Sequence, residues 1–278
     1  MSKIIVLGAS GMLGVAICER LKNHDVQAHT SKSLDMLCSH KLHEAVATFR
    51  PDYIINCAAY TAVDLAESNR EDAFSINATA VEKLAQIASH FKATLIHFST
   101  DYVFDGNAIS PYAVHHPTLP VNTYGASKLS GEEAARTLCG AHYIFRVSWL
   151  YAAHGKNFFR WVAETAMQDL NITDSQTGSP TSALDVATFI KHLIENDPVA
   201  YGTYHFTNTG SCTWFAFAKA INEKLGLNKK INPVASFKTA AVRPAYSVMD
   251  TSLAQKTFSH HIQSWQDALD DVIIQFKS

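Results

Sequence analysis

Cysteine, charge and long apolar runs are all scarce in this sequence. Its five cysteines are odd in number, scattered and never spaced as Cys-x-x-Cys, so neither a disulfide framework nor a zinc knuckle is expected. Charged residues make up 17% of the chain and leave a net charge of −2, which fits neither a polybasic nucleic-acid binder nor an acidic disordered chain. No apolar run approaches the roughly 20 residues of a membrane helix. These absences predict a cytoplasmic protein without nucleic-acid or membrane partners.

The first half of the chain alternates short apolar runs with amphipathic stretches. Residues 4–7 are Ile-Ile-Val-Leu, the pattern of a strand buried on both faces of a parallel sheet. Strands that alternate with crossover helices predict an α/β fold with a Rossmann-like, doubly wound parallel sheet. The predicted strands are 4–7, 26–29, 53–55, 94–98 and 143–147, and the predicted helices are 11–21, about 42–49, 73–90 and 127–139.

After about residue 150 the alternation becomes looser. The 278 residues, 47% of them hydrophobic, suffice for one α/β domain and a small lobe. We therefore predict an NAD(P)-binding Rossmann domain at 1–150, and in 151–278 mainly a small α/β substrate-binding lobe, with some segments returning to the first domain. Predicted there are helices near 157–167, 183–194, 214–225 and 265–276, the last opened by a capping box of Ser264 and Asp267, and strands at 170–173 and 203–206.

Three glycines with the spacing G-x-x-G-x-x-G follow the first predicted strand and open the first helix. Such a turn lets backbone N–H groups approach a diphosphate, whose charge the helix N-terminus favours. Glycine-rich turns also occur for packing alone, but the strand–turn–helix context favours a dinucleotide cofactor. The residues expected to bind it here are Gly8, Ser10, Gly11, Met12, Leu13 and Gly14.

The end of the second predicted strand bears on the choice of cofactor. An acidic residue there would bind the ribose 2′-hydroxyl of NAD, but the chain has Thr30, Ser31 and Lys32, and no carboxylate before Asp35. Hydroxyls and an ammonium can accept a 2′-phosphate, so the sequence favours NADPH, with NADH possible. The alternative is that Lys32 is only a solvated surface lysine.

Tyr124 and Lys128 are four residues apart, and on a helix two residues at this spacing share one face. A phenol has an ordinary pKa near 10, and we expect the neighbouring ammonium to lower it and so to tune proton transfer. Thr100 directly follows the fourth predicted strand, at the sheet edge where ligands bind, and could hydrogen-bond a substrate carbonyl. Taken singly, the pair could be an exposed helical pair and the threonine a turn residue.

Together with longer motifs, these residues resemble the dTDP-4-dehydrorhamnose reductase family of extended short-chain dehydrogenases/reductases. The resemblance extends over nearly the whole chain, and its most specific stretches read STDYVFDG and AAYTAVD. The matching segments are 8–14, 56–64 with Glu67, 76–79, 99–106, 120–125 with Lys128, Gly131 and Glu132, 146–151, 155–158, 176–181, and Arg243-Pro244 with Ser247.

The resemblance implies a reaction and roles for individual residues. A hydride would reach the C4 ketone of dTDP-4-dehydro-6-deoxy-L-mannose, Tyr124 would protonate the alkoxide, Lys128 would tune Tyr124 and hold the cofactor ribose, and Thr100 would orient the ketone. Beside the glycine loop, the resemblance implies cofactor contacts from Cys57, Ala58, Ala59, Tyr60, Asn77, Tyr124 and Lys128. It implies substrate contacts from Thr61, Val63, Thr100, Asp101, Tyr102, Trp149 and Arg243.

Two of these side chains have a specific expected contact and a plain alternative. Trp149 would offer a flat apolar face to the deoxysugar, or else be a core tryptophan. Arg243 would pair with the nucleotide diphosphate, or else form a surface salt bridge.

The sequence departs from the family pattern at two loops. Val114 and His116 occupy positions where the family usually has acids, and Ala152-Ala153-His154 occupies a stretch where a glycine is more usual. The paired histidines at 115–116 and 260–261 have no partners at metal-ligand spacing, so no metal is expected.

Two other functions remain open from the sequence. A non-catalytic NADP-binding subunit, like the regulatory subunit of methionine adenosyltransferase, resembles the same family. A nucleotide-sugar epimerase or dehydratase is the other alternative, although such enzymes are usually longer. For the leading interpretation we expect a nucleotide-sugar substrate and a monomer or homodimer.

Overall fold

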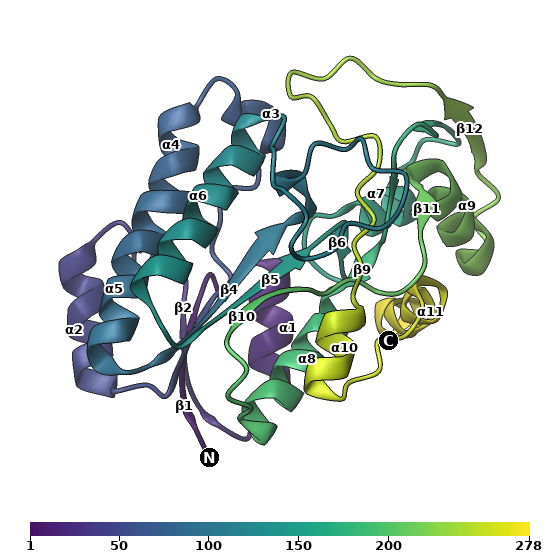
Figure 1. Cartoon of the computed structure of the whole chain (residues 1–278). Coiled ribbons are helices and arrows are strands. Elements are labelled where there is room, and N and C mark those ends of the chain that lie inside the picture. The colour runs from purple at the N-terminus through teal and green to yellow at the C-terminus, as the bar shows by residue number, and fades with distance from the viewer.

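The computed structural model describes residues 1–278 and is built around a six-stranded sheet (Figure 1). The strand order is β10-β5-β4-β3-β1-β2, and every neighbouring pair is parallel. This confirms the predicted doubly wound α/β fold. The strands are β1 (Lys3–Leu7), β2 (Asp25–His29), β3 (Tyr53–Asn56), β4 (Thr94–Thr100), β5 (His142–Val147) and β10 (Gly202–His205).

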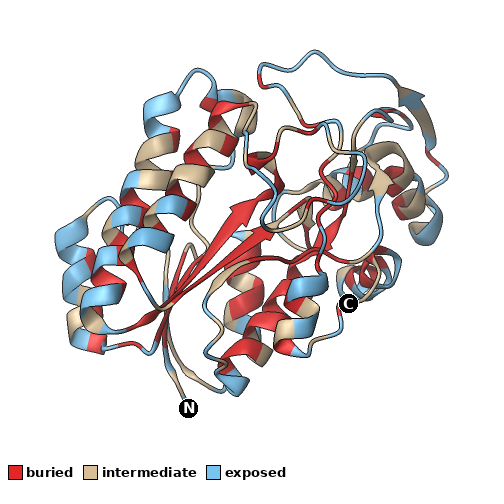
Figure 2. Cartoon of the chain, in the orientation of Figure 1, coloured by how far each residue is buried: buried red, intermediate tan, exposed pale blue.

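Helices cover both faces of this sheet, and two apolar cores result. Side chains alternate along β1, so Ile4 and Val6 lie in one core while Ile5 and Leu7 lie in the other. The central strands β3 and β4 are accordingly buried from end to end, whereas the helices are exposed on their outer faces (Figure 2). One core includes α1 (Met12–Arg20) and α8 (Ala183–Asn196), and the other includes α2 (Ser39–Phe49), α5 (Ala80–Phe91) and α6 (Thr123–Leu138).

The long helix predicted at 73–90 is not uniform. It consists of α4 (Arg70–Phe74), a π-helical segment η1 (Ser75–Thr79) and α5. A π-segment inside a helix is frequent at functional sites, and it holds the buried Asn77. Periodicity alone does not reveal such an insertion.

Helix α6 begins at Thr123, four residues before the predicted start, so that boundary was wrong. Asn122 is its N-cap, and its Oδ1 accepts a hydrogen bond from the Gly125 N–H at 2.8 Å. Glu67 also accepts the Thr123 N–H, at 2.8 Å. Because two side chains satisfy the first N–H groups, the helix can begin early, which puts Tyr124 in its first turn.

The elements after residue 150 form a lobe with its own core of 12 buried residues, apart from α8 and β10, which join the sheet layer. The lobe pairs its strands two at a time, and several of these strands have only two residues, which a sequence pattern cannot identify. Its strands are β6 (Leu150–Tyr151), β7 (Asp169–Thr173), β8 (Thr177–Gly178), β9 (Thr181–Ser182), β11 (Cys212–Thr213) and β12 (Lys230–Val234). Its helices are α7 (Phe158–Glu164), α9 (Trp214–Leu225) and α11 (Trp265–Lys277).

A long connection leads from β12 back across the molecule to α10 (Ser252–Phe258), a helix that the sequence did not predict (Figure 1). On its way it passes close to α3 (Val63–Ala66): Arg243 forms an ion pair with Asp64 at 2.7 Å. In addition, the Asn122 amide donates to the Val242 carbonyl at 2.8 Å. The segment therefore ties the lobe to the N-terminal ends of α3 and α6. No helix of this chain combines the length and the apolar character needed to cross a membrane.

Candidate active site

A cavity of about 560 Å³ lies at the carboxyl ends of β1, β3, β4 and β5. Ligands bind at this edge in open α/β sheets. The cavity brings together twelve predicted site residues: Ser10, Gly11, Met12, Leu13, Cys57, Ala59, Thr61, Thr100, Asp101, Tyr124, Lys128 and Trp149. It is also lined by residues that were not predicted: Phe98, Ser99, Val147, Ser148, Leu150, Gly155, Lys156 and Asn157.

The glycine loop forms one end of this cavity and fits a dinucleotide. Gly8 has a φ of +74°, and a Cβ there would lie 2.6 Å from the Ala58 nitrogen. A Cβ on Gly14 would lie 2.3 Å from the Gly8 carbonyl oxygen. Helix α1 starts from Gly11 with no side-chain cap, so its first N–H groups are free for an anionic ligand. Gly8 and Gly14 do not line the cavity but permit the turn that does.

Hydrogen bonds from side chains fix the backbone of the segment after β3. Asn56 Oδ1 accepts the Ala58 N–H at 3.1 Å. The Asn77 amide binds both backbone groups of Tyr60, at 2.9 and 3.0 Å, and also donates to Ser127 Oγ at 2.9 Å. Its polar atoms are thus occupied by the protein, so Asn77 positions the segment from the π-segment rather than reaching into the cavity.

The residues expected to discriminate the cofactors lie outside the cavity lining. Thr30 begins a tight turn in which its N–H and side chain bond Ser33. Ser31 and Lys32 are exposed beside it, at the carboxyl end of β2. The Ala9 N–H donates to the His29 carbonyl at 2.9 Å, which brings this turn next to the glycine loop.

The loop at 152–157, whose first three residues depart from the family pattern, packs on the glycine loop. His154 Nε2 donates to the Met12 carbonyl at 3.0 Å. Asn157 caps α7 and its amide donates to the carbonyls of Ala152 and His154 at 3.0 Å. The loop thereby brings Lys156 to the cavity wall. Residues 155–158 were included in the family resemblance, but no role was predicted for Lys156. A lysine in a segment shared with the family could have indicated a contact with the cofactor phosphates.

Thr100, Tyr124 and Lys128 all line this cavity. Burial raises the pKa of Tyr124 above its ordinary value, and hydrogen bonding to Thr100 offsets part of this rise. Burial also lowers the pKa of Lys128 to about 8. The Lys128 ammonium donates to the Phe98 carbonyl at 2.6 Å. The expected lowering of the Tyr124 pKa by Lys128 was therefore wrong: burial raises this pKa, and Lys128 is not among the groups that shift it.

Two buried polar atoms in the cavity wall have no protein partner: Ser99 Oγ and Asp101 Oδ2. Burial raises the pKa of Asp101 to about 6, against hydrogen bonds from Ser247 and Thr100 that lower it. Unpaired buried polar atoms are costly, and a polar ligand would satisfy them. Ser99 was not predicted, because only the cavity geometry distinguishes it from its neighbour Thr100.

Trp149 does not present a bare face. Its ring stacks on Trp214 with centroids 3.6 Å apart and planes 9° apart. Its φ is +45°, a conformation that L-residues rarely adopt. A Cβ on Gly178 would lie 2.5 Å from the Trp149 ring, so that residue must be small. Its packing against Trp214 and Gly178 thus holds Trp149 in a strained backbone conformation at the cavity wall.

Trp214 lines a second cavity, of about 660 Å³, on the other side of this stack. The second cavity is largely aromatic and aliphatic and lies between α7, β7 and the connection after β12. Its lining includes Phe158, Trp161, Leu170, Ile172, Trp214, Phe237 and Arg243. Sequence reasoning assigned no role to Trp214, because only the fold brings residue 214 to residue 149.

Arg243 belongs to this second cavity rather than to the first. Its Nη2 pairs with Asp64 at 2.7 Å and its Nη1 donates to the Tyr102 hydroxyl at 3.4 Å. Tyr102 packs edge-on against Tyr124, with ring centroids 5.7 Å apart. Val63 opens α3 beside Asp64 and does not line either cavity. The guanidinium retains N–H donors for a ligand, although its carboxylate partner is already in place.

The loop that carries Val114 and His116 is held in place without the two acids that the family usually has there. The Val114 carbonyl, not its side chain, accepts a hydrogen bond from Arg146 at 3.1 Å. His116 packs edge-on against Tyr112, with ring centroids 4.9 Å apart. This loop therefore stays anchored without the two carboxylates.

Comparison with known proteins gives consistent results. Residues 2–278 match the family described as RmlD substrate binding domain. The dTDP-4-dehydrorhamnose reductase of Escherichia coli is 40% identical over 236 residues, 80% of this chain and 79% of that protein. A probable dTDP-4,6-dihydroxy-2-methyloxan-3-one 4-ketoreductase of Streptomyces antibioticus is 36% identical over 95% of this chain and 92% of its own.

A solved structure shares the whole fold. The dTDP-4-dehydrorhamnose reductase of Bacillus anthracis, solved in complex with NADP, superimposes with a TM-score of 0.94 at 36% identity, covering 99% of each chain. These likenesses do not favour a regulatory subunit or an epimerase. The chain is an oxidoreductase and belongs to the family of the dTDP-4-dehydrorhamnose reductases.

Proposed function

We propose that this protein reduces the C4 ketone of dTDP-4-dehydro-6-deoxy-L-mannose, or of a closely related dTDP keto-sugar, to the alcohol. The observation that carries the proposal is the convergence of Thr100, Tyr124 and Lys128 with the glycine loop on one cavity. The relative from Streptomyces antibioticus, named for a different sugar at similar identity, is the reason to include related keto-sugars.

Tyr124 is suited to donate a proton in the direction of reduction. Because burial raises the pKa of its phenol, the group stays protonated at neutral pH and can protonate an alkoxide as it forms. Thr100, which hydrogen-bonds Tyr124, would orient the ketone oxygen towards that phenol. When bound, the reduced nicotinamide supplies the hydride.

We propose that residues 1–150 hold NADPH, with NADH as the weaker alternative. Gly8, Gly11 and Gly14 would admit the diphosphate, while Lys128 would bind the nicotinamide ribose. The exposed turn of Thr30, Ser31 and Lys32 would receive the 2′-phosphate. Lys156, on the loop that packs against the glycine loop, would add a second cation.

The lobe within 151–278 would hold the sugar nucleotide. Asp101 and Trp149 line the first cavity and would contact the sugar. The second cavity has the aromatic lining that suits a pyrimidine base, and Arg243 at its rim would donate to the diphosphate. All of these groups come from one chain, so a monomer suffices for the site, and a homodimer would not alter it. The cytoplasm, where reduced nicotinamide is available, is the compartment we propose.

The decisive assay measures loss of reduced-nicotinamide absorbance. Purified protein is mixed with the dTDP keto-sugar, made in situ from dTDP-glucose, and with NADPH or NADH in separate reactions. Oxidation that requires the sugar nucleotide supports the proposal, and the ratio of the two rates gives the cofactor preference. NADPH binding without oxidation would contradict it and favour a binding role; a Lys128→Met variant serves as the inactive control.

A further inference from the structure

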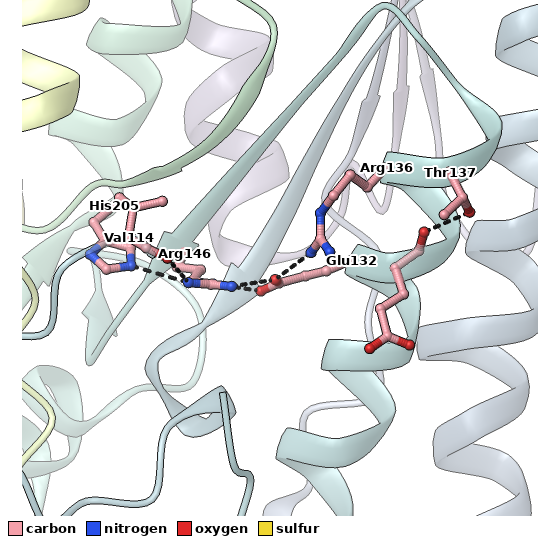
Figure 3. A network of polar contacts seen from close by, with 7 residues as sticks. Val114, Glu132, Arg136, Thr137, Arg146 and His205 are labelled. Atoms are coloured by element: carbon pink, nitrogen blue, oxygen red, sulfur yellow. Dashed lines mark hydrogen bonds and ion pairs between the residues drawn. The ribbon is translucent and has the colours of Figure 1, made fainter. Parts of the chain in front are cut away.

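A buried ion pair lies directly behind the candidate catalytic residues. Glu132 is the residue four positions after Lys128 on α6, and its side chain is 0% exposed. Both its oxygens accept from Arg146 of β5, Oε1 from Nε at 2.9 Å and Oε2 from Nη2 at 2.7 Å. Figure 3 shows this fork-to-fork pairing, with Arg136 approaching the same carboxylate from a second side.

Each nitrogen of the Arg146 guanidinium has at least one polar partner. Its Nη1 donates to the Val114 carbonyl at 3.1 Å and faces His205 Nε2 at 3.4 Å. His205 Nδ1 donates to the Asp250 carbonyl at 3.2 Å, which leaves Nε2 as an acceptor. Burial and the Arg146 charge lower the pKa of His205 to about 3, so the ring is neutral. The guanidinium also lies 5.1 Å from the Phe104 ring centroid.

Such a pair costs much to bury and needs a reason beyond stability. Desolvation of two charges can exceed their attraction, and apolar replacements of both are often neutral or stabilising. What the pair does supply is geometry, because it joins α6 to β5 at one rotation and one depth. On the opposite side, a Cβ on Gly131 would lie 2.1 Å from the Asn77 carbonyl oxygen, so α6 has no room to shift there.

The same helix face carries the candidate catalytic groups. Tyr124, Lys128 and Glu132 succeed one another at intervals of four residues, and all three are directed towards the sheet. Lys128 reaches β4 through the Phe98 carbonyl, and Glu132 reaches β5 through Arg146. The ion pair is therefore the next contact of α6 with the sheet after the Lys128 contact.

We propose that Glu132, held by Arg146, is a positioning residue for Lys128 and Tyr124: it fixes α6 against the sheet and places a buried carboxylate one turn along the helix from Lys128. The proposal rests on the proposed function for the roles of Lys128 and Tyr124. It adds a residue that touches neither cavity.

The charged and titratable groups around Lys128 favour this assignment. From β4, His97 is buried and neutral, because burial and the Lys128 charge lower its pKa. From the end of β3, Cys57 is a thiol whose pKa burial raises. On α6 itself, the Tyr124 phenol has a raised pKa and is neutral as well. Among the groups that raise the pKa of Lys128, Glu132 is the foremost and the only carboxylate.

The test measures Lys128 without requiring turnover. Protein labelled with ¹³C at lysine Cε is titrated by two-dimensional NMR, and the Lys128→Met variant identifies the signal. In the parent we expect a midpoint near pH 8. In Glu132→Gln we expect that midpoint to fall by about one unit, because a buried neighbouring charge is removed, and kcat at pH 7 to fall about tenfold. The alkaline limit of the kcat profile should fall with it.

Two further variants separate positioning from folding. Glu132→Leu combined with Arg146→Met removes the pair without leaving a lone buried charge, so its melting temperature should stay near that of the parent. We expect its Lys128 midpoint and kcat to fall nonetheless. Arg136→Gln is the matched control, because Arg136 contacts the same Glu132 oxygen at 3.5 Å but is 45% exposed; it should leave both values unchanged.

The outcomes discriminate clearly. A folded double variant with the parent's Lys128 midpoint and kcat would overturn the proposal and make the pair purely structural. If the double variant melts far below the parent, the Lys128 midpoint is measured in Glu132→Gln instead. An unchanged midpoint in that variant would also overturn the proposal. Because the titration uses no substrate, a wrong reaction assignment would leave its result intact.

Discussion

The two cavities on either side of the Trp149–Trp214 stack differ in almost every physical respect. The first is lined by a glycine turn and by buried groups whose pKa values are shifted, Asp101, Tyr124 and Lys128 among them. The second is lined mainly by aromatic and aliphatic side chains and has one guanidinium at its rim. Shifted pKa values concentrate where chemistry occurs, whereas apolar pockets hold and orient ligands.

The difference separates two tasks within one site. Residues of the first cavity should govern kcat and its pH dependence, and residues of the second should govern the affinity for the sugar nucleotide. Substitutions on each side therefore test the division.

The largest effect is expected from Tyr124→Phe. Loss of the proton donor should lower kcat by about 10³-fold, while NADPH affinity, measured by fluorescence titration, should change less than about twofold because no charge is removed. Tyr102→Phe is the matched comparison, since its hydroxyl faces Arg243 rather than Thr100, and its kcat should fall far less. Parent-like turnover in Tyr124→Phe would refute the assignment of the first cavity.

The Asp101→Asn variant should show that the buried Asp101 carboxylate lowers the free energy of unfolding at neutral pH. The Asp101 pKa of about 6 in the folded protein exceeds its ordinary value of 3.8, so the folded state loses stability as pH rises from about 4 through 6. The variant does not ionise there. Its free energy of unfolding should therefore match the parent's near pH 4 and exceed it by on the order of 2 kcal/mol above pH 7, as measured by urea unfolding at each pH. A pH-independent difference would contradict this account.

Trp214→Ala should act from the second cavity. Without its stacking partner, Trp149 loses the contact that holds its strained conformation, and the nucleotide loses an aromatic surface. We expect the KM for the sugar nucleotide to rise about tenfold with kcat changed less than about threefold, in line with one aromatic contact. Trp214→Phe, which keeps a ring, should recover most of the affinity. A fall confined to kcat would break the proposed division between the cavities.

The smallest effect is expected from Lys32→Ala. Its side chain is exposed at the end of β2, where a charge contact with a phosphate is screened and worth about 1 kcal/mol or less. The Kd for NADPH should rise about threefold to fivefold, and that for NADH should not change. Lys22→Ala, another exposed lysine, serves as control. Equal effects on both cofactors would place the 2′-phosphate elsewhere.

Much of the sheet was predictable because its signals are local. The apolar run 4–7, the glycine turn after it and the amphipathic helices each occupy consecutive residues, and most recur in the structure at nearly the predicted bounds; the start of α6 and the interrupted helix at 73–90 are the exceptions. The helix Trp214–Leu225 was predicted at its observed limits. The strand end identified Thr100, the four-residue spacing identified Tyr124 and Lys128, and the family resemblance grouped the three.

What the sequence did not reveal depends on contacts between distant segments. The stack of Trp149 on Trp214 and the pairing of Glu132 with Arg146 exist only after folding. The early start of α6 depends on Glu67, which lies 56 residues before the N–H that it accepts. The direction of the Tyr124 pKa shift also escaped prediction, because it is set by burial, which the spacing of Tyr124 and Lys128 does not reveal.

The most direct test of the central claim determines which carbon of the product receives the hydride from NADPH. NADPH carrying deuterium in place of both hydrogens at the reactive nicotinamide carbon is incubated with the protein and the dTDP keto-sugar, and the product is examined by NMR. If the ketone is reduced beside Tyr124 as proposed, deuterium will be found at sugar C4 and nowhere else, and Tyr124→Phe will lower its rate of incorporation by about 10³-fold. Deuterium at another carbon, or a product without deuterium, would contradict the account.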